Sequence, residues 1–377
     1  MASKYSMHTH TCGELRRSNI GTEVTLTGWV WHRRDHGGLI FVDLRDRAGV
    51  TQISFDPEHS GGTAFHTAEQ IRLEWPILVH GVVRERPEGM ANDKLATGEI
   101  EVLVSAIEVL NSSKTPPFQI EDHVGASEDV RLRYRYLDLR RPHMMANLQL
   151  RSDFTHAIRE ALHKRSFMEV ETPSLFKSTP EGARDFLVPS RTQPGHFYAL
   201  PQSPQLLKQL LMIGGVERYY QIAKCFRDED LRADRQPEFT QVDIEMSFVR
   251  QDDVMGALEA VLHDAFAALG VEMKLPLRRI SYWDAMDTYG IDKPDTRFGM
   301  HLHDVTSIFV GSKFKLFAGA AATEGQYVKA LNAKGAGSWP RAQIDKLADV
   351  AATFGATGLA WIAFRPDGSM NSLIVKL

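Results

Sequence analysis

Cysteine is nearly absent from this chain, which has only Cys12 and Cys225 among its 377 residues. Two cysteines so far apart exclude a disulfide framework and a cysteine-based metal site, and they are typical of a reducing compartment. No uncharged apolar run approaches the roughly 20 residues of a membrane helix, and the N-terminus lacks the apolar segment of a signal peptide. We therefore expect a cytoplasmic protein with no membrane partner.

An excess of charge of one sign is also missing, because 44 basic and 48 acidic residues leave a net charge of -4. Binding to nucleic acid therefore has to be argued from local features. The sequence has no G-x-G-x-x-G, G-x-x-x-x-G-K-[ST] or H-E-x-x-H motif, and His8 and His10 have no third ligand in view, so we expect no metal site. The composition, 43% apolar and 24% charged, is that of a globular protein, and the length suggests about two to three domains.

The first hundred residues read as short strands separated by turns, with one helix after the third strand. Five strands arranged in this way are typical of an OB-fold barrel. The expected strands are Val24–His32, Leu39–Arg45, Val50–Phe55, Ile77–Arg86 and Glu99–Leu110, and the expected helix is Thr63–Leu73.

Alternate residues of these strands face opposite ways, which separates a core from an outer face. Phe41, Gln52 and Glu101 fall on the outer face, where an aromatic ring beside amide and carboxylate groups suits a reader of single-stranded RNA. The alternative is that they are ordinary surface residues, and the charges of nearby Arg33, Arg34 and Arg45 fit either reading. The expected core residues are Ile40, Val42, Leu44, Ile53, Phe55, Ile100, Val102 and Val104.

A linker follows the barrel, with prolines between Ser112 and Pro117 and acidic residues between Glu121 and Asp129. The next segment, Arg131–Arg141, carries five arginines in eleven residues. These arginines suit either the backbone of an RNA or an ion-paired hinge.

The middle of the chain reads as a helix, Asn147–Arg165, followed by a strand from Phe167 to Pro173. Because Pro173 has no N–H to donate, it belongs at a strand end or on an edge strand, and a dimer interface is one place where such an edge is covered. The alternative is a helix packed on a strand with no partner.

The segment Arg218–Phe248 reads as two strands joined by a charged loop that is rich in arginine, a residue suited to polyphosphate or to the end of a nucleic acid. A buried face that carries charges must pair them or bind a polar ligand. An ion-paired interior is the alternative, and a ligand site is favoured because the groups have mixed sign and include an aromatic residue. The expected front face has Gln221, Arg227, Glu229, Phe239, Gln241, Asp243, Glu245 and Ser247, and the expected back has Thr240, Val242, Ile244, Met246 and Phe248.

Several strings carry a resemblance to a known family. Cys225-Phe-Arg-Asp-Glu229 and Arg235-Gln-Pro-Glu-Phe-Thr-Gln241 resemble the second signature motif of class II aminoacyl-tRNA synthetases, and the helix and strand ending at Pro173 resemble the first. The likeness is more specific to bacterial-type aspartyl-tRNA synthetases and runs from Gly13 to Leu377. It rests on Gly28-Trp-Val-Trp-His-Arg-Arg-Asp35, Thr179-Pro-Glu-Gly-Ala-Arg-Asp185, Gln202-Ser-Pro-Gln-Leu-Leu-Lys208 and Tyr289-Gly-Ile-Asp-Lys-Pro-Asp-Thr-Arg297.

The resemblance implies a ligase that joins L-aspartate to ATP, releases pyrophosphate and passes the aspartyl group to the 3′ end of tRNA(Asp). Mg²⁺ on the phosphates of ATP is also implied. Arg227 would bridge the substrate carboxylate and the α-phosphate as the catalytic residue, and Phe239 would stack on adenine. The implied ATP-binding residues are Arg227, Asp228, Glu229, Gln236 and Phe239.

The resemblance also implies an aspartate subsite. Gln205 and Lys208 are three residues apart on an expected helix and share a face, so that Lys208 can neutralise the side-chain carboxylate of aspartate. Lys208 as a plain surface lysine is the alternative without the flanking motif. The implied aspartate-binding residues are Glu181, Ser203, Gln205, Lys208, Arg227, Gln241 and Asp243.

The barrel is implied to read the anticodon. His36 and Gly89 stand where family members that charge both tRNA(Asp) and tRNA(Asn) tend to carry His and a small residue, so we expect tRNA(Asn) as a second substrate. The alternative is that both residues serve turn geometry. The implied anticodon-binding residues are Arg34, His36, Phe41, Gln52, Gly89 and Glu101.

The expected fold is therefore a multidomain α+β chain that forms a homodimer. We expect an OB-fold barrel at 1–112, a hinge at 113–137, an antiparallel-sheet class II core with the first and second motifs at 138–297, and part of an α/β insertion domain at 298–377. The third motif of the family and its ATP-covering arginine are not in the sequence. We therefore expect a fragment of a longer protein, with negligible aspartate-dependent ATP–pyrophosphate exchange by itself, and the alternative function is that of a non-catalytic tRNA-binding chain.

Overall fold

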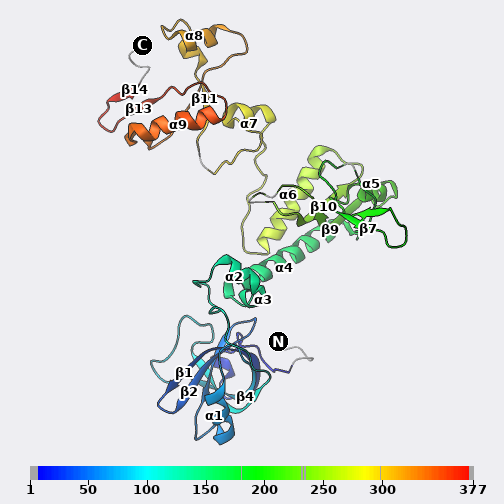
Figure 1. Ribbon diagram of the computed structural model, residues 1–377, viewed down its shortest axis with the longest axis vertical. Coiled ribbons are helices and arrows are strands. Elements are labelled where there is room, and N and C mark those ends of the chain that lie inside the picture. The colour runs from blue at the N-terminus through cyan, green and yellow to red at the C-terminus, as the bar shows by residue number, and fades with distance from the viewer. Residues whose placement is uncertain (1–6, 180, 231, 233–234, 298, 373–377) are drawn as a thin grey trace. The chain divides into compact units, whose positions relative to one another are not determined.

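The computed structural model describes residues 7–179, 181–230, 232, 235–297 and 299–372 (Figure 1). The chain divides into two compact units, Met1–Leu275 and Pro276–Leu377. None of the helices in the described residues is long and apolar enough to cross a membrane.

The first unit begins with a closed barrel whose strands follow the order β1-β2-β3-β5-β4. The predicted OB-fold is confirmed, with α1 (Gly61–Gln70) after the third strand. The first strand is longer than predicted because it continues to His36, where the hairpin turns through Gly37 and Gly38 at φ +61° and +95°, a region that favours glycine. The strands are β1 (Glu23–His36), β2 (Leu39–Arg45), β3 (Val50–Phe55), β4 (Pro76–Glu85) and β5 (Ile100–Val109).

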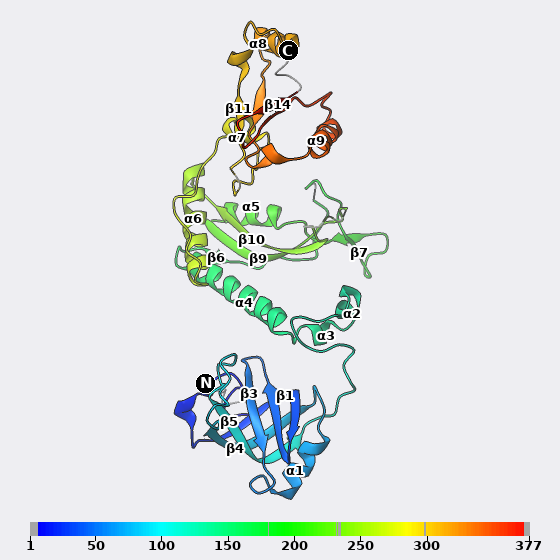
Figure 2. The same ribbon diagram turned by 90° about the vertical axis from the view of Figure 1, so that its left-hand side faces the viewer.

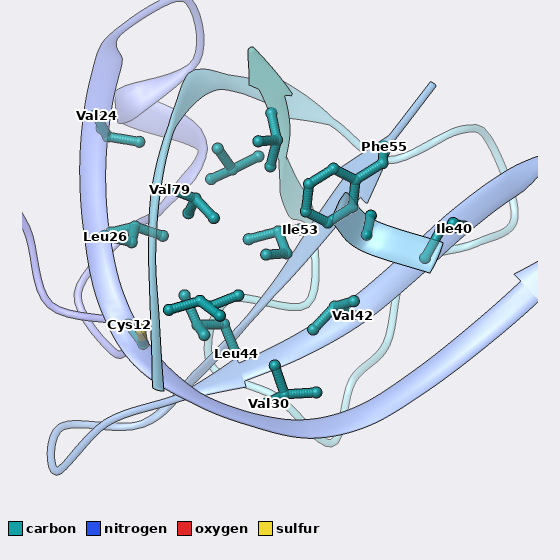
Figure 3. Packing of buried hydrophobic residues seen from close by; sticks show 14 of the residues in the cluster. Cys12, Val24, Leu26, Val30, Ile40, Val42, Leu44, Ile53, Phe55 and Val79 are labelled. Atoms are coloured by element: carbon teal, nitrogen blue, oxygen red, sulfur yellow. The ribbon is translucent and has the colours of Figure 1, made fainter. Parts of the chain in front are cut away.

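The barrel interior holds the predicted apolar residues. All eight residues expected in the core are fully buried. Side chains from the segment before the first strand, including Cys12, complete the same cluster (Figure 3). The period-2 pattern of the strands therefore gives the barrel core directly.

An ion-paired hinge follows the barrel. The carboxylate of Asp138, at the end of α3 (Arg135–Asp138), is fully buried and accepts hydrogen bonds from Arg135 at 2.6 Å and Arg141 at 2.9 Å. Arg131, on α2 (Glu128–Arg133), lies 4.0 Å from the same carboxylate. Of the two readings of this arginine-rich segment, the ion-paired hinge is the one that these contacts support.

A second buried ion pair joins the hinge to the barrel. Glu74 accepts from Arg45 of β2 at 2.7 Å and from Arg140 at 2.9 Å, and its backbone adopts φ +63°, a strained value for a residue other than glycine. Arg140 also lies over the Trp29 ring, 4.6 Å from its centroid. Arg45, whose charge fitted either an RNA-binding face or an ordinary surface, is therefore a buried structural group.

The rest of the first unit is built on a sheet of order β10-β9-β6. Strands β9 (Arg218–Phe226) and β10 (Glu238–Met246) are antiparallel, and β6 (Met168–Glu169) runs parallel to β9. Figure 2 shows the sheet between α4 (Pro142–His163) on one face and α5 (Gln205–Ile213) on the other, and α6 (Gln251–Ala267) packs on α4. Tyr220, Ile222, Ile244 and Met246 form the back of the sheet and pack on α4 and α6.

Two predicted strand boundaries are wrong. The second strand ends at Met246, because Phe248 turns the chain at φ +57° and is 93% exposed, so it is not part of the apolar back. The strand expected from Phe167 to Pro173 is limited to Met168–Glu169, since the ladder to β9 stops after Val170 and Pro173 has no N–H to extend it. A short hairpin, β7 (Leu187–Pro189) and β8 (Phe197–Ala199), lies between this strand and α5 in the sequence.

The second unit combines helices with two small two-stranded antiparallel sheets, β11-β12 and β13-β14. Its first helix, α7, begins after Ser281, whose hydroxyl caps the Asp284 N–H, and ends at Gly290 with φ +73°. Its longest helix, α9, begins at Arg341, directly after Pro340. The elements are α7 (Tyr282–Tyr289), β11 (Leu302–Asp304), α8 (Lys315–Ala322), β12 (Lys329–Leu331), α9 (Arg341–Thr353), β13 (Ile362–Phe364) and β14 (Met370–Ser372).

Candidate functional site

The candidate site lies on the face of the sheet that α5 covers. In the register of the two long strands, Asp243 pairs with Gln221, Gln241 with Ala223 and Phe239 with Cys225. Residues paired directly across an antiparallel ladder point to the same face. The front face predicted from parity is therefore present, with mixed polar and aromatic groups.

Lys208 brings a positive charge to this face. It is the fourth residue of α5, and its side chain is 10% exposed. Its Nζ donates to Asp243 Oδ1 at 3.0 Å and lies 3.3 Å from Glu245 Oε2. The reading of Lys208 as a plain surface lysine is wrong, because its ammonium group is buried between two carboxylates.

Asp243 is unusual because half of its carboxylate has no partner. Its Oδ2 is buried and accepts no hydrogen bond within the described part of the chain. Burial raises the pKa of Asp243, the charges of Glu245 and Glu181 raise it further, and Lys208 opposes them without cancelling the shift. A buried acceptor with an open lone pair suits a cationic donor such as an ammonium group.

The floor of the site holds a neutral thiol. Cys225 Sγ lies 3.3 Å from Gln241 Oε1 and donates to it. Burial, with a contribution from Asp243, raises the pKa of Cys225 to about 11, so the thiol stays protonated and unreactive at neutral pH.

A loop on one side of the site presents Glu181. The Ser203 hydroxyl donates to Glu181 Oε2 at 2.6 Å, and the Thr179 hydroxyl donates to Oε1 at 3.1 Å. The Ser203 Oγ also accepts from the backbone N–H of Gln205 at 3.3 Å. The structure thus brings Glu181 next to Ser203 and Lys208 next to Asp243, as two contact pairs.

The other predicted ATP-binding residues lie on β10 or in the segment between β9 and β10, which begins with Arg227. The guanidinium of Arg227 lies over the ring of Phe239, 5.1 Å from the centroid, and forms with it a flat wall that is aromatic and cationic. Glu229 pairs with Arg235 at 3.3 Å, and the N–H of Asp228 donates to the Arg184 carbonyl. Gln236 is exposed in the loop before β10.

The predicted anticodon face of the barrel carries a polar network. Arg34 donates to Gln52 at 3.2 Å, Gln52 donates to Glu101 at 2.7 Å, and Arg84 donates to Glu101 at 2.8 Å. Gln52 and Glu101 lie on the outer parity but are 9% and 1% exposed. Their polar atoms are therefore engaged within the protein, and Arg34 and Arg84 are the more accessible members of the network.

His36 is the last residue of β1, directly before the hairpin turn, and Gly89 lies in a turn after β4. The His36 ring is 6.1 Å from the half-buried Phe41 ring, so two aromatic groups lie at the end of the β1–β2 hairpin. Gly89 has φ +78°, and no atom lies within 4 Å of the position that a Cβ would occupy. Turn geometry by itself is thus enough to favour glycine at position 89.

Three residues of these networks were not among the predicted site residues. Glu245 shares the parity of Asp243, which was the available signal. Arg84 shares the outward parity of His80 and Val82 on β4. Gln202 is 1% exposed, and its side chain bonds to Ala183 and Asp185. It gave no signal, because a polar residue inside a motif does not reveal that it is buried. Among the described residues, no group of three or more His, Cys, Asp or Glu side chains could hold a metal ion.

Comparison with family models identifies both parts of this architecture. Residues 127–353 match the model for tRNA synthetases class II (D, K and N). Residues 24–110 match the model for the OB-fold nucleic acid binding domain.

Individual relatives agree with the family models. The chain is 56% identical to the aspartate–tRNA(Asp/Asn) ligase of Desulfatibacillum aliphaticivorans over 98% of this chain and 62% of the relative, and 57% identical to that of Moorella thermoacetica over 97% and 61%. It thus spans about three fifths of the length of these curated relatives. The asparaginyl-tRNA synthetase from Pyrococcus horikoshii in complex with asparaginyl-adenylate is similar in structure, with a TM-score of 0.62 and 27% identity over 70% of this chain and 58% of that one.

Proposed function

This chain belongs to the class II tRNA synthetases of the D, K and N group, and from this membership we propose that it is the aspartate-activating and anticodon-reading portion of an aspartate–tRNA ligase. The names of its relatives support aspartate as the amino acid and tRNA(Asp) and tRNA(Asn) as the acceptors. We place the protein in the cytoplasm, in agreement with its cysteine content.

The observation that carries the proposal is the buried pair of Lys208 and Asp243. L-aspartate has a side-chain carboxylate, an α-ammonium and an α-carboxylate. Lys208 offers a desolvated cation to the first group, and the open oxygen of Asp243 offers an acceptor to the second. Lysine as a substrate would place a cation against Lys208, and asparagine would leave the buried charge of Lys208 without a counter-charge from the ligand.

The reaction needs positioning and charge neutralisation more than acid–base groups. The α-carboxylate of aspartate attacks the α-phosphorus of ATP and pyrophosphate leaves; a ribose hydroxyl of tRNA then attacks the acyl carbon and AMP leaves. Arg227 would neutralise the charge that develops between the carboxylate and the α-phosphate. Mg²⁺ would arrive on the phosphates, near the exposed carboxylates of Asp228 and Glu229.

We further propose a homodimer. Strand β6 is at the edge of its sheet, and Met168 on this strand is 56% exposed. An exposed edge strand of this kind is a surface that a second copy of the chain could cover. Size measurement in solution at several protein concentrations tests this assembly, and a monomer at every concentration would contradict it.

ATP–pyrophosphate exchange with each amino acid tests the proposed activity. Any exchange should depend on L-aspartate, and exchange driven equally by asparagine or lysine would contradict the proposal. Because the chain by itself is expected to exchange little, binding of L-aspartate and ATP is measured as well, and binding of tRNA with no binding of either ligand would instead favour the second candidate, a non-catalytic tRNA-binding chain of the same family.

Phe239→Leu should weaken ATP binding. Loss of one aromatic stacking surface costs about 1 kcal/mol or more, which is about a fivefold or larger rise in the Kd for ATP. Binding of aspartate in the absence of ATP should be unchanged. Calorimetry with ATP measures the effect, and Phe197→Leu, on an exposed residue of β8, is the control. Equal ATP affinity in the parent and in Phe239→Leu would remove Phe239 from the nucleotide site.

His36→Leu should shift tRNA choice towards tRNA(Asp). The two tRNAs differ at one anticodon base, and discrimination at one base is worth about 1 to 3 kcal/mol by analogy with DNA readout. Filter binding of both transcripts should show similar affinities for the unchanged chain and about a fivefold preference for tRNA(Asp) in the variant. His66→Leu, on the exposed side of α1, is the control. Rejection of tRNA(Asn) by the unchanged chain would refute relaxed specificity.

A further inference from the structure

Gln202 is a buried amide that the proposed mechanism does not use. Gln202 is 1% exposed and lies next to Ser203, in the segment just before α5. Its Nε2 donates to the Ala183 carbonyl at 2.9 Å, and its Oε1 accepts from the Ala183 N–H at 3.2 Å. The same Nε2 donates to Asp185 Oδ1.

Through these bonds the side-chain amide of Gln202 pairs with Ala183 as the backbone of a neighbouring strand would. One side chain satisfies both polar backbone groups of Ala183, in the manner of a paired strand residue. Asp185 is held from the other side by the hydroxyl of Ser178. Gln202 therefore holds this loop, described at residues 178–179 and 181–185, at two positions, Ala183 and Asp185.

The loop that Gln202 holds is the loop that carries Glu181. Ser203, the next residue along the chain, donates to Glu181 at 2.6 Å. Two consecutive residues thus bind the same loop. The Gln202 side chain binds the backbone of Ala183, and the Ser203 hydroxyl binds the carboxylate of Glu181. The loop is also joined to the strand that leads to Arg227, because the Arg184 carbonyl accepts from the Asp228 N–H at 3.0 Å.

We propose that Gln202 is a positioning residue for the amino-acid subsite: by fixing Ala183, it holds the Glu181 carboxylate against Ser203 at the distance that aspartate recognition requires. The inference rests on the proposed function. Gln202 itself touches neither aspartate nor ATP. Its effect should therefore fall on aspartate and spare the nucleotide.

The chemistry of glutamine explains the choice of residue. Methionine has a similar volume but neither donor nor acceptor of comparable strength. Asparagine is one methylene shorter and does not span to both groups of Ala183. Glutamate would replace the donor with a second carboxylate beside Asp185.

The test compares Gln202→Met with Gln209→Met, a matched change at an exposed residue of α5. Amide hydrogen exchange is followed across residues 181–185, and calorimetry measures the affinities for L-aspartate and ATP separately. In Gln202→Met we expect the Ala183 amide to exchange at least tenfold faster and the Kd for aspartate to rise at least tenfold. We expect the Kd for ATP to change by less than twofold, and Gln209→Met to resemble the parent in every measurement.

Gln202→Asn provides a second variant in case the methionine variant misfolds, and it should show the same pattern to a smaller extent. Faster exchange with unchanged aspartate affinity would overturn the inference. Equal losses of aspartate and ATP binding, or the unfolding of both variants, would also overturn it, because either result would indicate a general structural role for Gln202. If the unchanged chain does not bind aspartate, the proposed substrate is wrong and the inference fails with it, a result distinguishable because it appears in the parent.

Discussion

Lys208→Met is expected to remove most of the affinity for L-aspartate. A charge-assisted hydrogen bond contributes about 1.5 to 3 kcal/mol, so the Kd should rise by about 10- to 150-fold while ATP binding is retained. The same change leaves Asp243 and Glu245 as buried carboxylates without their cation. Removal of one partner from a buried ion pair costs about 3 kcal/mol or more of folding free energy.

The loss of folding stability in Lys208→Met should depend on pH in a defined direction. The folded-state pKa of Asp243 is already raised, mainly by burial, and loss of Lys208 should raise it further. A carboxyl with a raised folded-state pKa favours the folded state below its unfolded pKa, and this contribution is lost as the pH rises through the folded-state pKa. The stability deficit of Lys208→Met should therefore shrink on acidification.

Urea unfolding at several pH values and calorimetry with aspartate measure the two effects. Lys224→Met is the control, because Lys224 is 60% exposed and its pair with Glu238 is a surface contact. Unchanged aspartate affinity in Lys208→Met would show that the carboxylate of aspartate binds elsewhere.

Asp138→Asn is expected to cause the largest loss of stability outside the site. Asp138 is fully buried against Arg135 and Arg141, so its neutralisation leaves buried guanidinium charge without a counter-charge. The expected cost is about 3 kcal/mol or more. Asp129→Asn, at an exposed residue of α2, should change stability by less than about 1 kcal/mol.

The stability loss in Asp138→Asn should also decrease in acid, but the carboxyl of Asp138 has a lowered pKa, whereas the pKa of Asp243 is raised. Burial of Asp138 acts to raise its pKa, but the hydrogen bond from Arg141 and the charges of Arg141, Arg135 and Arg131 outweigh it, so that the pKa lies below its usual range. Its contribution is present above the unfolded pKa and is lost as the pH falls through the folded-state pKa. The difference between parent and Asp138→Asn in urea unfolding should be full at neutral pH and decrease in acid. A difference that is constant with pH would exclude the carboxylate charge as its source.

The sequence predicts most strongly where a short period governs the structure. Alternation in the barrel strands separates buried residues such as Ile53 from the outer face, and a three-residue helical spacing brings Gln205 and Lys208 to one face. Parity tells which way a side chain points but not what covers it. For this reason the burial of Gln52 and Glu101 beneath arginine side chains was not predictable.

Contacts between segments that are far apart in the chain could not be predicted from the sequence either. The arginines near Asp138 were compatible with RNA binding until their partners were known. Gln202 meets Ala183 across 19 residues, and Arg140 meets Glu74 across 66, separations that no local pattern reports. The strand end at Met246 depends on the left-handed turn at Phe248, a conformation that a Phe residue rarely adopts.

Calorimetric titration of the chain with L-aspartate and with L-asparagine tests the central claim most directly. The two amino acids have nearly the same shape and differ in the charge of the side chain, which is the property that the buried Lys208 would recognise. The account predicts that aspartate binds at least roughly tenfold more tightly, in line with the worth of a charge-assisted hydrogen bond, and that the preference disappears in Lys208→Met. Asparagine binding as tightly as aspartate, or more tightly, would contradict it.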